Sequence, residues 1–243
     1  MILIQFPARS DKLGDIIAID GPAGAGKSTV AMLLARELGF RYLDTGSMYR
    51  AVTYLSMNRK INPYDEGKLV ELCKTAQFEF DFNPVRFLFK IFINGEDVTQ
   101  LIRTKNVDLM VSAFSKNPGV RSEMVKKQRS LIGNDDAVVE GRDIASVVFR
   151  HAILKIFMTA SPKERAKRRI QQNRRLGIGN TDSLEKVISQ IKMRDELDSR
   201  RKQSPLVPTR ESIIIDSTAR RPEDIASEVI NEYRRRKSDL QNS

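Results

Sequence analysis

The sequence predicts an α/β fold, with a parallel central sheet between two layers of helices. Short apolar runs, typical of buried strands, alternate along the chain with segments whose apolar residues follow helical spacing. The glycine-rich stretch GPAGAGKST lies at the junction of one such pair. A chain of 243 residues, 40% of them hydrophobic, supplies enough apolar surface for the core of one substantial domain.

The elements follow one another in a regular order. The apolar run IIAID at 16–20 predicts a buried strand, and the segment 27–38 has helical apolar spacing and ends before Gly39. Residues 41–43 predict a second strand, and residues 44–60 a second helix. Further strands are predicted within 135–141, 153–160 and 212–217. This alternation is typical of a parallel sheet with helices on both faces.

One segment breaks the alternation. Between about 77 and 103, polar and apolar residues alternate with a period of two, and Asn94-Gly95 is a turn signal. We therefore expect a small antiparallel sheet, inserted between elements of the main sheet.

The net charge of +11 admits nucleic acid, an acidic membrane surface or a small polyanionic substrate as a partner. Much of the excess lies in 163–175 and 192–202, where basic residues are mixed with helix formers, and in RRRK at 234–237. We interpret the first two as structured helices and the last as a solvated helix end.

We expect a cytoplasmic protein with no membrane segment. No apolar run approaches the roughly 18 residues that span a bilayer, and MILIQF before Pro7 is too short for a secretory signal. Because Cys73 is the only cysteine, the chain has no internal disulfide and no cysteine-rich metal site, and we expect a buried helix residue there.

The glycine-rich stretch satisfies the pattern G-x-x-x-x-G-K-[ST] between a strand and a helix, where a phosphate-binding loop needs to lie. Glycines let backbone N–H groups turn toward phosphate oxygens, and the helix that begins near Lys27 adds its positive end. Lys27 is suited to the β- and γ-phosphates of ATP, and the Ser28 hydroxyl to Mg²⁺. The expected nucleotide contacts are Gly21, Pro22, Ala23, Gly24, Ala25, Gly26, Lys27, Ser28 and Thr29.

The same loop serves switch GTPases, motor ATPases and small-molecule kinases. A guanine-reading Asn-Lys-x-Asp stretch is absent, and no clear acidic residue ends a long apolar strand as it does in a motor. These absences disfavour a switch or a motor.

A kinase also needs cations that hold its acceptor in line with the donor, and arginine binds phosphate through two parallel hydrogen bonds. Arg50, Arg121 and Arg142, the last followed by Asp143, are candidates. In the helical segment 192–202, Arg194, Asp198 and Arg201 share one face, because they are spaced i, i+4 and i+7.

Six blocks in order resemble the bacterial cytidylate kinases, which transfer the γ-phosphate of ATP to CMP or dCMP: GPAGAGKST, YLDTGSMYRA, VEGRDIASVVF, KIFMTASPKERAKRR, IKMRDELDSRRKQSPLVPT and IIIDST. The likeness runs from Ile16 to about Tyr233. It implies a P-loop three-layer sandwich forming a single domain over 16–243, with an acceptor-binding insert at about 77–111 and a helical lid at about 162–182. Residues 1–15 precede the usual start and match nothing.

The resemblance also implies roles for individual residues. Lys27, Arg142 and Arg194 act in catalysis, and the lid arginines Arg165, Arg168 and Arg169 close over the ATP phosphates. The implied contacts to the acceptor nucleotide are Thr45, Tyr49, Arg50, Ser112, Arg121, Arg142, Asp143, Arg194, Asp198 and Arg201. The chain departs from the family in having Glu140 where aspartate is common and IASVVF where MGTVVF is common.

Two alternatives stay open. One is another small-molecule kinase on the same fold, against which the insert and the GRD block argue. The other is a nucleic-acid-binding ATPase, but the arginine-rich helices have no aromatic residue between Lys163 and Lys202 on which bases could stack. We expect CMP and dCMP as acceptors, ATP and Mg²⁺ as cofactors, no nucleic-acid or membrane partner, and a monomer.

Overall fold

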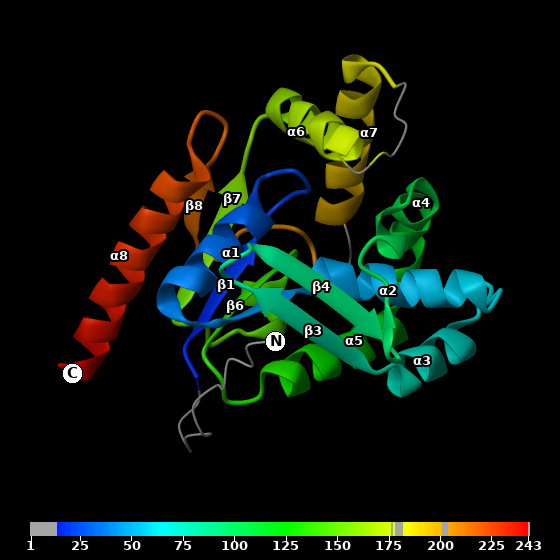
Figure 1. Cartoon of the computed structure of the whole chain (residues 1–243), viewed down its shortest axis with the longest axis horizontal. Helices are drawn as coiled ribbons and strands as arrows, with labels where there is room; N and C mark the ends of the chain where they lie inside the picture. Colours follow the sequence, from blue (N-terminus) through cyan, green and yellow to red (C-terminus); the bar gives the residue numbers. More distant parts are fainter. Residues whose placement is uncertain (1–13, 176, 178–181, 201–203, 243) are drawn as a thin grey trace.

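The computed structural model describes residues 14–175, 177, 182–200 and 204–242, and it confirms the α/β fold (Figure 1). Five parallel strands form the central sheet in the order β2-β6-β1-β7-β8. Their bounds are β1 Ile16–Asp20, β2 Arg41–Asp44, β6 Ala137–Gly141, β7 Leu154–Thr159 and β8 Ile213–Asp216.

The middle of the sheet is built from strands that are buried along their whole length. Every residue of β1 and β6 is buried, as expected for a parallel strand covered on both faces. Their register pairs Ile16 with Ala137 and Asp20 with Gly141, so both strands end at the same level. The loops that follow Asp20 and Gly141 therefore leave the sheet side by side.

Helices connect the strands and cover the sheet. Their bounds are α1 Lys27–Leu38, α2 Thr45–Asn58, α3 Glu66–Thr75, α4 Lys105–Phe114, α5 Pro118–Ile132, α6 Pro162–Arg175, α7 Leu184–Ser199 and α8 Pro222–Gln241, with a short 3-10 helix η1 at Leu101–Arg103 and a π-helix η2 at Ile144–Val148. Figure 1 shows α6 and α7 packed together at the top, away from α8 and α3. None of the helices in the described ranges is long and apolar enough to cross a membrane.

Local sequence signals explain several helix ends. The Asp44 carboxylate accepts a hydrogen bond from the backbone of Ser47 (3.0 Å) and caps α2, and Asn117 caps α5 ahead of Pro118. Gly39 ends α1 in the left-handed conformation, with φ 69°, which is accessible to glycine at little cost. The sequence thus places α2 directly after β2 and α1 one short loop after β1, with their first turns at the same edge of the sheet.

The insert is a three-stranded antiparallel sheet, as the sequence predicts: β3 Phe78–Asn83, β4 Leu88–Ile93 and β5 Glu96–Asp97. Asn94 and Gly95 make the turn between β4 and β5 with positive φ angles of 52° and 81°. The ring of Phe89 lies 5.0 Å from that of Tyr42, centroid to centroid, in an edge-to-face contact. This contact holds the insert against β2.

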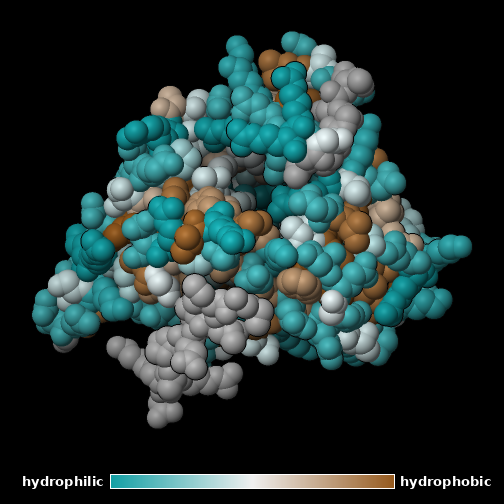
Figure 2. All heavy atoms as spheres, in the orientation of Figure 1, coloured by the Kyte–Doolittle hydropathy of each residue, from teal (hydrophilic) through white to brown (hydrophobic). Residues whose placement is uncertain are grey.

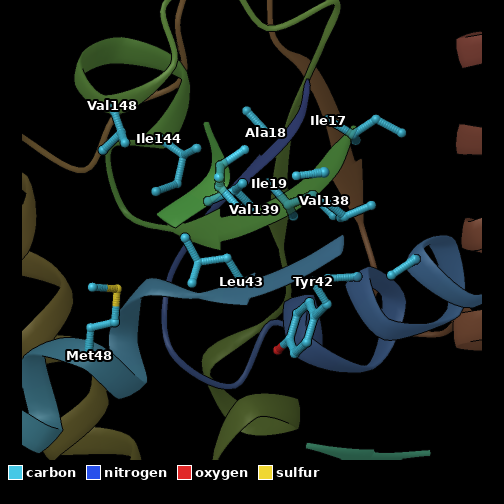
Figure 3. Packing of buried hydrophobic residues seen from close by; sticks show 14 of the residues in the cluster. Ile17, Ala18, Ile19, Tyr42, Leu43, Met48, Val138, Val139, Ile144 and Val148 are labelled. Carbon is cyan, nitrogen blue, oxygen red and sulfur yellow. The ribbon is translucent and has the colours of Figure 1, made fainter. Parts of the chain in front are cut away.

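The core lies between the sheet and its helices. Figure 3 shows Ala18, Val139 and Leu43, which are register partners on three neighbouring strands, with Met48 of α2 in the same core. Cys73 is fully buried in α3, in agreement with the sequence analysis, and burial raises the pKa of its thiol to about 12. That thiol stays protonated near neutral pH and has a packing role.

Candidate active site

A cavity of about 200 Å³ opens at the carboxyl ends of β1, β2 and β6. This is the edge at which open parallel sheets bind ligands. The surface is hollowed at this place, beneath α6 and α7 (Figure 2). The predicted site residues that line the cavity are Ala23, Gly24, Lys27, Ser28, Thr45, Tyr49, Arg50, Arg121, Arg142, Asp143, Arg194 and Asp198.

The phosphate loop joins β1 to α1 with a backbone that requires glycine. Gly21 has φ 144°, and a Cβ there would lie 2.0 Å from the carbonyl oxygen of Met158 on β7. Gly24 and Gly26 also have positive φ angles, of 78° and 87°. Because α1 begins at Lys27, its free N–H groups and the positive end of its dipole face the loop. The geometry suits a phosphate group.

Lys27 is a buried ammonium held inside this loop. Its Nζ donates to the carbonyl oxygen of Pro22 at 3.1 Å. The pKa of Lys27 is lowered to about 8, chiefly by burial and also by the charge of Arg142, whereas Glu140 acts in the opposite direction. A polyphosphate would supply the anionic partner that favours the charged form of this side chain.

Two carboxylates stand beside Ser28 at the ends of neighbouring strands. Glu140 of β6 is buried and accepts a hydrogen bond from the Tyr42 hydroxyl at 2.6 Å. Burial raises the pKa of Glu140, and Asp44 raises it further, whereas Lys27 and a hydrogen bond with the Ser28 hydroxyl lower it. In the sequence, Glu140 stands out only as a departure from a family pattern, and its pairing with Asp44 beside Ser28 was not predicted.

The chemistry of these oxygens fits Mg²⁺. Magnesium is bound in proteins by one or two carboxylates together with water and substrate phosphates, and Ser28, Asp44 and Glu140 offer such oxygen atoms beside the phosphate loop. Within the described ranges, no three His, Cys, Asp or Glu side chains gather into a closed metal site.

Arg142 connects the loop after β6 to two other parts of the site. Its Nη1 donates to the carbonyl oxygen of Gly21 at 2.6 Å, and its Nε donates to Asp198 of α7 at 3.1 Å. Its neighbour Asp143 forms a buried ion pair with Arg121 of α5, whose guanidinium lies 5.7 Å from the centre of the Tyr49 ring. The GRD block is thus fixed on the phosphate loop, α5 and α7.

Arg194 of α7 is half-buried and has an incomplete set of partners. Its Nε is buried, and no other described residue forms a hydrogen bond with it. The pKa of Arg194 is lowered to about 10, chiefly by burial and also by the charges of Arg142 and Arg50, whereas Asp198 acts in the opposite direction. A buried donor that is unsatisfied in this way destabilises the protein unless a ligand completes it. Among the described residues, the arginines that line the cavity are Arg50, Arg103, Arg121, Arg142 and Arg194, of which Arg103 was not predicted from the sequence.

The three lid arginines have different partners. Arg165 is buried and makes two hydrogen bonds to Asp195 of α7, at 3.0 and 2.5 Å. Arg168 donates to Ser217, whose hydroxyl in turn donates to the carbonyl oxygen of Ala25 in the phosphate loop at 2.8 Å. Arg165 therefore ties α6 to α7, whereas Arg168 lies over the phosphate loop.

Arg169 shares one carboxylate with an arginine of the acceptor side. Asp108 of α4 forms ion pairs with both Arg169 of α6 and Arg50 of α2. Burial raises the pKa of Asp108, but the two arginine charges outweigh burial and the pKa is lowered overall. Asp108 thus remains ionised at neutral pH and holds the lid to the acceptor side.

A match to a known protein family identifies the family of this chain. The profile described as "Cytidylate kinase" matches residues 17–235, nearly the whole chain. The chain belongs to the cytidylate kinase family. The predicted resemblance is confirmed, and with it the assignment to the ATP-dependent nucleoside monophosphate kinases, which are phosphotransferases.

Curated cytidylate kinases match over most of their own length. The cytidylate kinase of Limosilactobacillus reuteri (strain DSM 20016) is 45% identical over 213 residues, which are 88% of this chain and 92% of the relative. That of Geobacillus sp. (strain WCH70) is 43% identical over 219 residues, 89% of this chain and 96% of the relative. That of Lysinibacillus sphaericus (strain C3-41) is 43% identical over 214 residues, which are 88% of this chain and 94% of the relative.

Some of the residues that the cytidylate kinase resemblance implies lie elsewhere than on the cavity wall. Ser112 is on α4 but does not line the cavity, whereas Ser115, one turn further, does. Thr29 is exposed on α1, and Arg201 lies outside the described residues. The other predicted residues that do not line the cavity are Gly21, Pro22, Ala25, Gly26, Arg165, Arg168 and Arg169.

Proposed function

We propose that this protein transfers the γ-phosphate of ATP to CMP or dCMP, giving ADP and CDP or dCDP. Family membership supports the reaction, and one observation in the molecule supports it best. The phosphate loop faces, across a single cavity, a cluster of arginines that includes the unsatisfied Arg194. A donor phosphate and an acceptor phosphate would meet between them.

Positioning and charge neutralisation supply the catalysis in this proposal. Lys27 and the loop N–H groups hold the donor, and Arg142 and Arg194 hold the acceptor phosphate, so that its oxygen attacks the γ-phosphorus in line. Because the acceptor is already an anion, no general base is assigned. The buried cations need no reorganisation as charge develops, which is where fixed electrostatics contribute most.

The roles of the other acceptor-site residues are proposed from their positions and from the family resemblance. Arg50 and Arg121 bind the phosphate as further clamps, with Arg201 assigned by resemblance alone. Asp143 and Asp198, which lie beside Arg121 and Arg142, contact the sugar or the base. The assignments to the nucleoside side are Thr45, Tyr49 and Ser112.

Mg²⁺ would be held by Ser28 and the nucleotide phosphates, with Asp44 and Glu140 as the neighbouring carboxylates. The ion supplies positive charge that neutralises the phosphate oxygens during transfer. Arg168 and Arg169, on the lid helix, are placed to close the site and exclude water, with Arg165 anchoring that helix to α7.

The larger organisation is also part of the proposal. Residues 16–243 form one domain, in which the insert at about 77–111 serves the acceptor and the lid at about 162–182 covers the donor. The protein acts as a monomer in the cytoplasm and needs no nucleic acid. Light scattering on the purified protein tests whether it is a monomer. A salt titration with DNA and RNA tests whether it binds nucleic acid, because binding through phosphates weakens steeply with salt.

The direct test is product identification. The protein is incubated with ATP, Mg²⁺ and CMP, and the nucleotides are separated by chromatography. Equal amounts of CDP and ADP are expected from the wild type, and Lys27→Ala should abolish both. ADP formed without CDP would overturn the proposal in favour of an ATPase.

A further inference from the structure

Strand β1 ends in a buried carboxylate that the proposed mechanism does not use. Asp20 is 4% exposed and immediately precedes the phosphate loop. Its Oδ1 accepts a hydrogen bond from the N–H of Ile144, and its Oδ2 accepts one from the N–H of Ala145, both at 2.8 Å. The two amides follow directly after Arg142 and Asp143 in the chain.

These hydrogen bonds complete a clamp around the GRD block. On one side, Gly141 pairs with Asp20 in the register between β6 and β1. On the other side, the carboxylate of Asp20 holds the first two residues of the π-helix η2. Only Arg142 and Asp143 lie between these two attachments, so one residue of β1 fixes both ends of the segment that carries them.

The same segment is tied back to the donor loop by a side chain. Arg142 donates to the carbonyl oxygen of Gly21, which is the residue next to Asp20. The segment after β6 therefore donates two kinds of hydrogen bond to the end of β1 and the loop after it. The backbone N–H of Ile144 donates to the side chain of Asp20, and the side chain of Arg142 donates to the backbone of Gly21. A shift of either loop would break one of them.

The carboxylate has an energetic cost that an uncharged side chain would not have. The pKa of Asp20 is raised to about 6, chiefly by burial and also by Asp143, whereas the two backbone hydrogen bonds and Lys27 oppose the shift. Asp143 and Lys27 are the charged groups that face Asp20. A carboxylate is suited to this place because it has two acceptor atoms and no donor, so it satisfies two adjacent N–H groups at once.

We propose that Asp20 is a positioning residue that couples the donor loop to the acceptor site, by fixing Arg142 and Asp143 relative to the phosphate loop. The inference deepens the proposed function, on which its kinetic consequence rests. Asparagine at this position keeps one acceptor but turns an N–H₂ group against the second backbone N–H. The segment after β6 then loses its second attachment.

Amide hydrogen exchange tests the clamp without any nucleotide. In Asp20→Asn, peptides that cover 142–149 should exchange at least about tenfold faster than in the wild type, because two protecting hydrogen bonds are weakened. Peptides from α8 should exchange as before. Unchanged protection at 144 and 145 would overturn the inference, and this result holds whatever the acceptor proves to be.

A double-mutant cycle tests the coupling to Arg142. Asp20→Asn should lower kcat/KM for CMP by about 10- to 100-fold while the Kd for ATP changes less than about threefold, since the loop binds ATP through its own amides. In an Arg142→Ala background, Asp20→Asn should lower kcat/KM by a clearly smaller factor than in the wild type, because one of the two side chains that it positions is gone. Independent, multiplying losses would contradict the inference.

Controls separate positioning from general stability. Tyr233→Phe removes the hydrogen bond to Asp15 at the opposite end of β1 and should leave KM for CMP unchanged. Asp20→Glu, which keeps the charge but displaces the oxygens by one methylene, replaces Asp20→Asn if the latter does not fold, and the same pattern is expected. If the wild type turned over no CMP, the proposed function would fail, and hydrogen exchange would still decide the clamp.

Discussion

Arg142 Nε donates a hydrogen bond to the buried carboxylate of Asp198 at 3.1 Å, across 56 positions of sequence. Arg142 lies just beyond the carboxyl end of β6 and Asp198 near the end of α7, which packs on the lid helix α6. The pair connects the edge of the sheet that holds the phosphates to the helices that close over it. Acceptor binding and lid position are therefore expected to influence one another.

Arg194→Met should stabilise the ligand-free protein and impair the enzyme. The substitution removes a half-buried cation whose buried Nε has no hydrogen-bond partner among the described residues, so thermal unfolding should show a gain of about 1–2 kcal/mol. KM for CMP should rise at least about 30-fold, because a charge-assisted contact to phosphate is lost. Arg200→Met, at the exposed end of α7, is the control and should change neither quantity. A destabilised Arg194→Met protein would contradict the assignment of a ligand-satisfied cation.

Glu140→Gln should raise the Mg²⁺ concentration that gives half-maximal activity by about tenfold, because a carboxylate beside the phosphate loop is neutralised. The side chains have the same shape, so the Tyr42 hydroxyl keeps an acceptor. A titration of activity with Mg²⁺, after removal of metal with EDTA, measures the change. Glu211→Gln, an exposed residue paired with Lys155, serves as the control. An unchanged Mg²⁺ requirement would remove Glu140 from the proposed metal environment.

Asp108→Asn should lower KM for CMP by about threefold to fivefold. Its carboxylate forms an ion pair with Arg50 in the ligand-free protein and competes with an incoming phosphate for that arginine. Partly exposed ion pairs of this kind contribute up to about 1 kcal/mol. Asp97→Asn, in β5, is the matched control. A rise in KM would mean that Asp108 aligns Arg50 and does not compete for it.

Lowering the pH should stabilise the protein, because protonation removes the cost of burying the charged Asp20 carboxylate. The same change should lower the activity. The folded pKa of about 6 exceeds the ordinary value of 3.8, so the folded state binds a proton between these values and the unfolded state does not. Burial of the charged form above pH 6 thus costs about 3 kcal/mol, which is relieved as the pH falls toward 4. The protonated carboxyl has one acceptor fewer for Ile144 and Ala145, so kcat/KM for CMP should fall below about pH 6.

Denaturant unfolding at pH 7 and pH 5 measures the stability half of this prediction. The difference in unfolding free energy between wild type and Asp20→Asn should change in favour of the wild type as the pH falls. A difference that does not depend on pH would show that Asp20 keeps an ordinary pKa.

Features that depend on short stretches of sequence were predictable. The spacing from Gly21 to Ser28 between an apolar run and a helical segment predicts the loop, its strand and its helix, because all three are set by local sequence. The Asn94-Gly95 turn predicts the small sheet for the same reason. The family resemblance added the arginines of the distant segments, which local spacing does not bring together.

Features that depend on tertiary contacts were not predictable. Glu140 is placed beside Ser28 only because β6 pairs with β1 in one register. Asp108 reaches Arg169 only because α4 approaches the lid helix, and the spacing of Arg165, Arg168 and Arg169 says nothing of their three separate partners. The π-helix η2 begins where Asp20 accepts hydrogen bonds from two adjacent N–H groups, those of Ile144 and Ala145, which lie 124 and 125 positions away in the sequence.

The most direct test of the account is a coupled assay of ADP formation from ATP and Mg²⁺ with CMP, dCMP, UMP, AMP and GMP offered separately. The account predicts turnover chiefly with CMP and dCMP, and its loss in Arg142→Ala and Arg194→Ala. Equal turnover with AMP or GMP, or ADP formation that is independent of any acceptor, would contradict the claim that the phosphate held by Gly21 to Thr29 passes to a cytidine monophosphate.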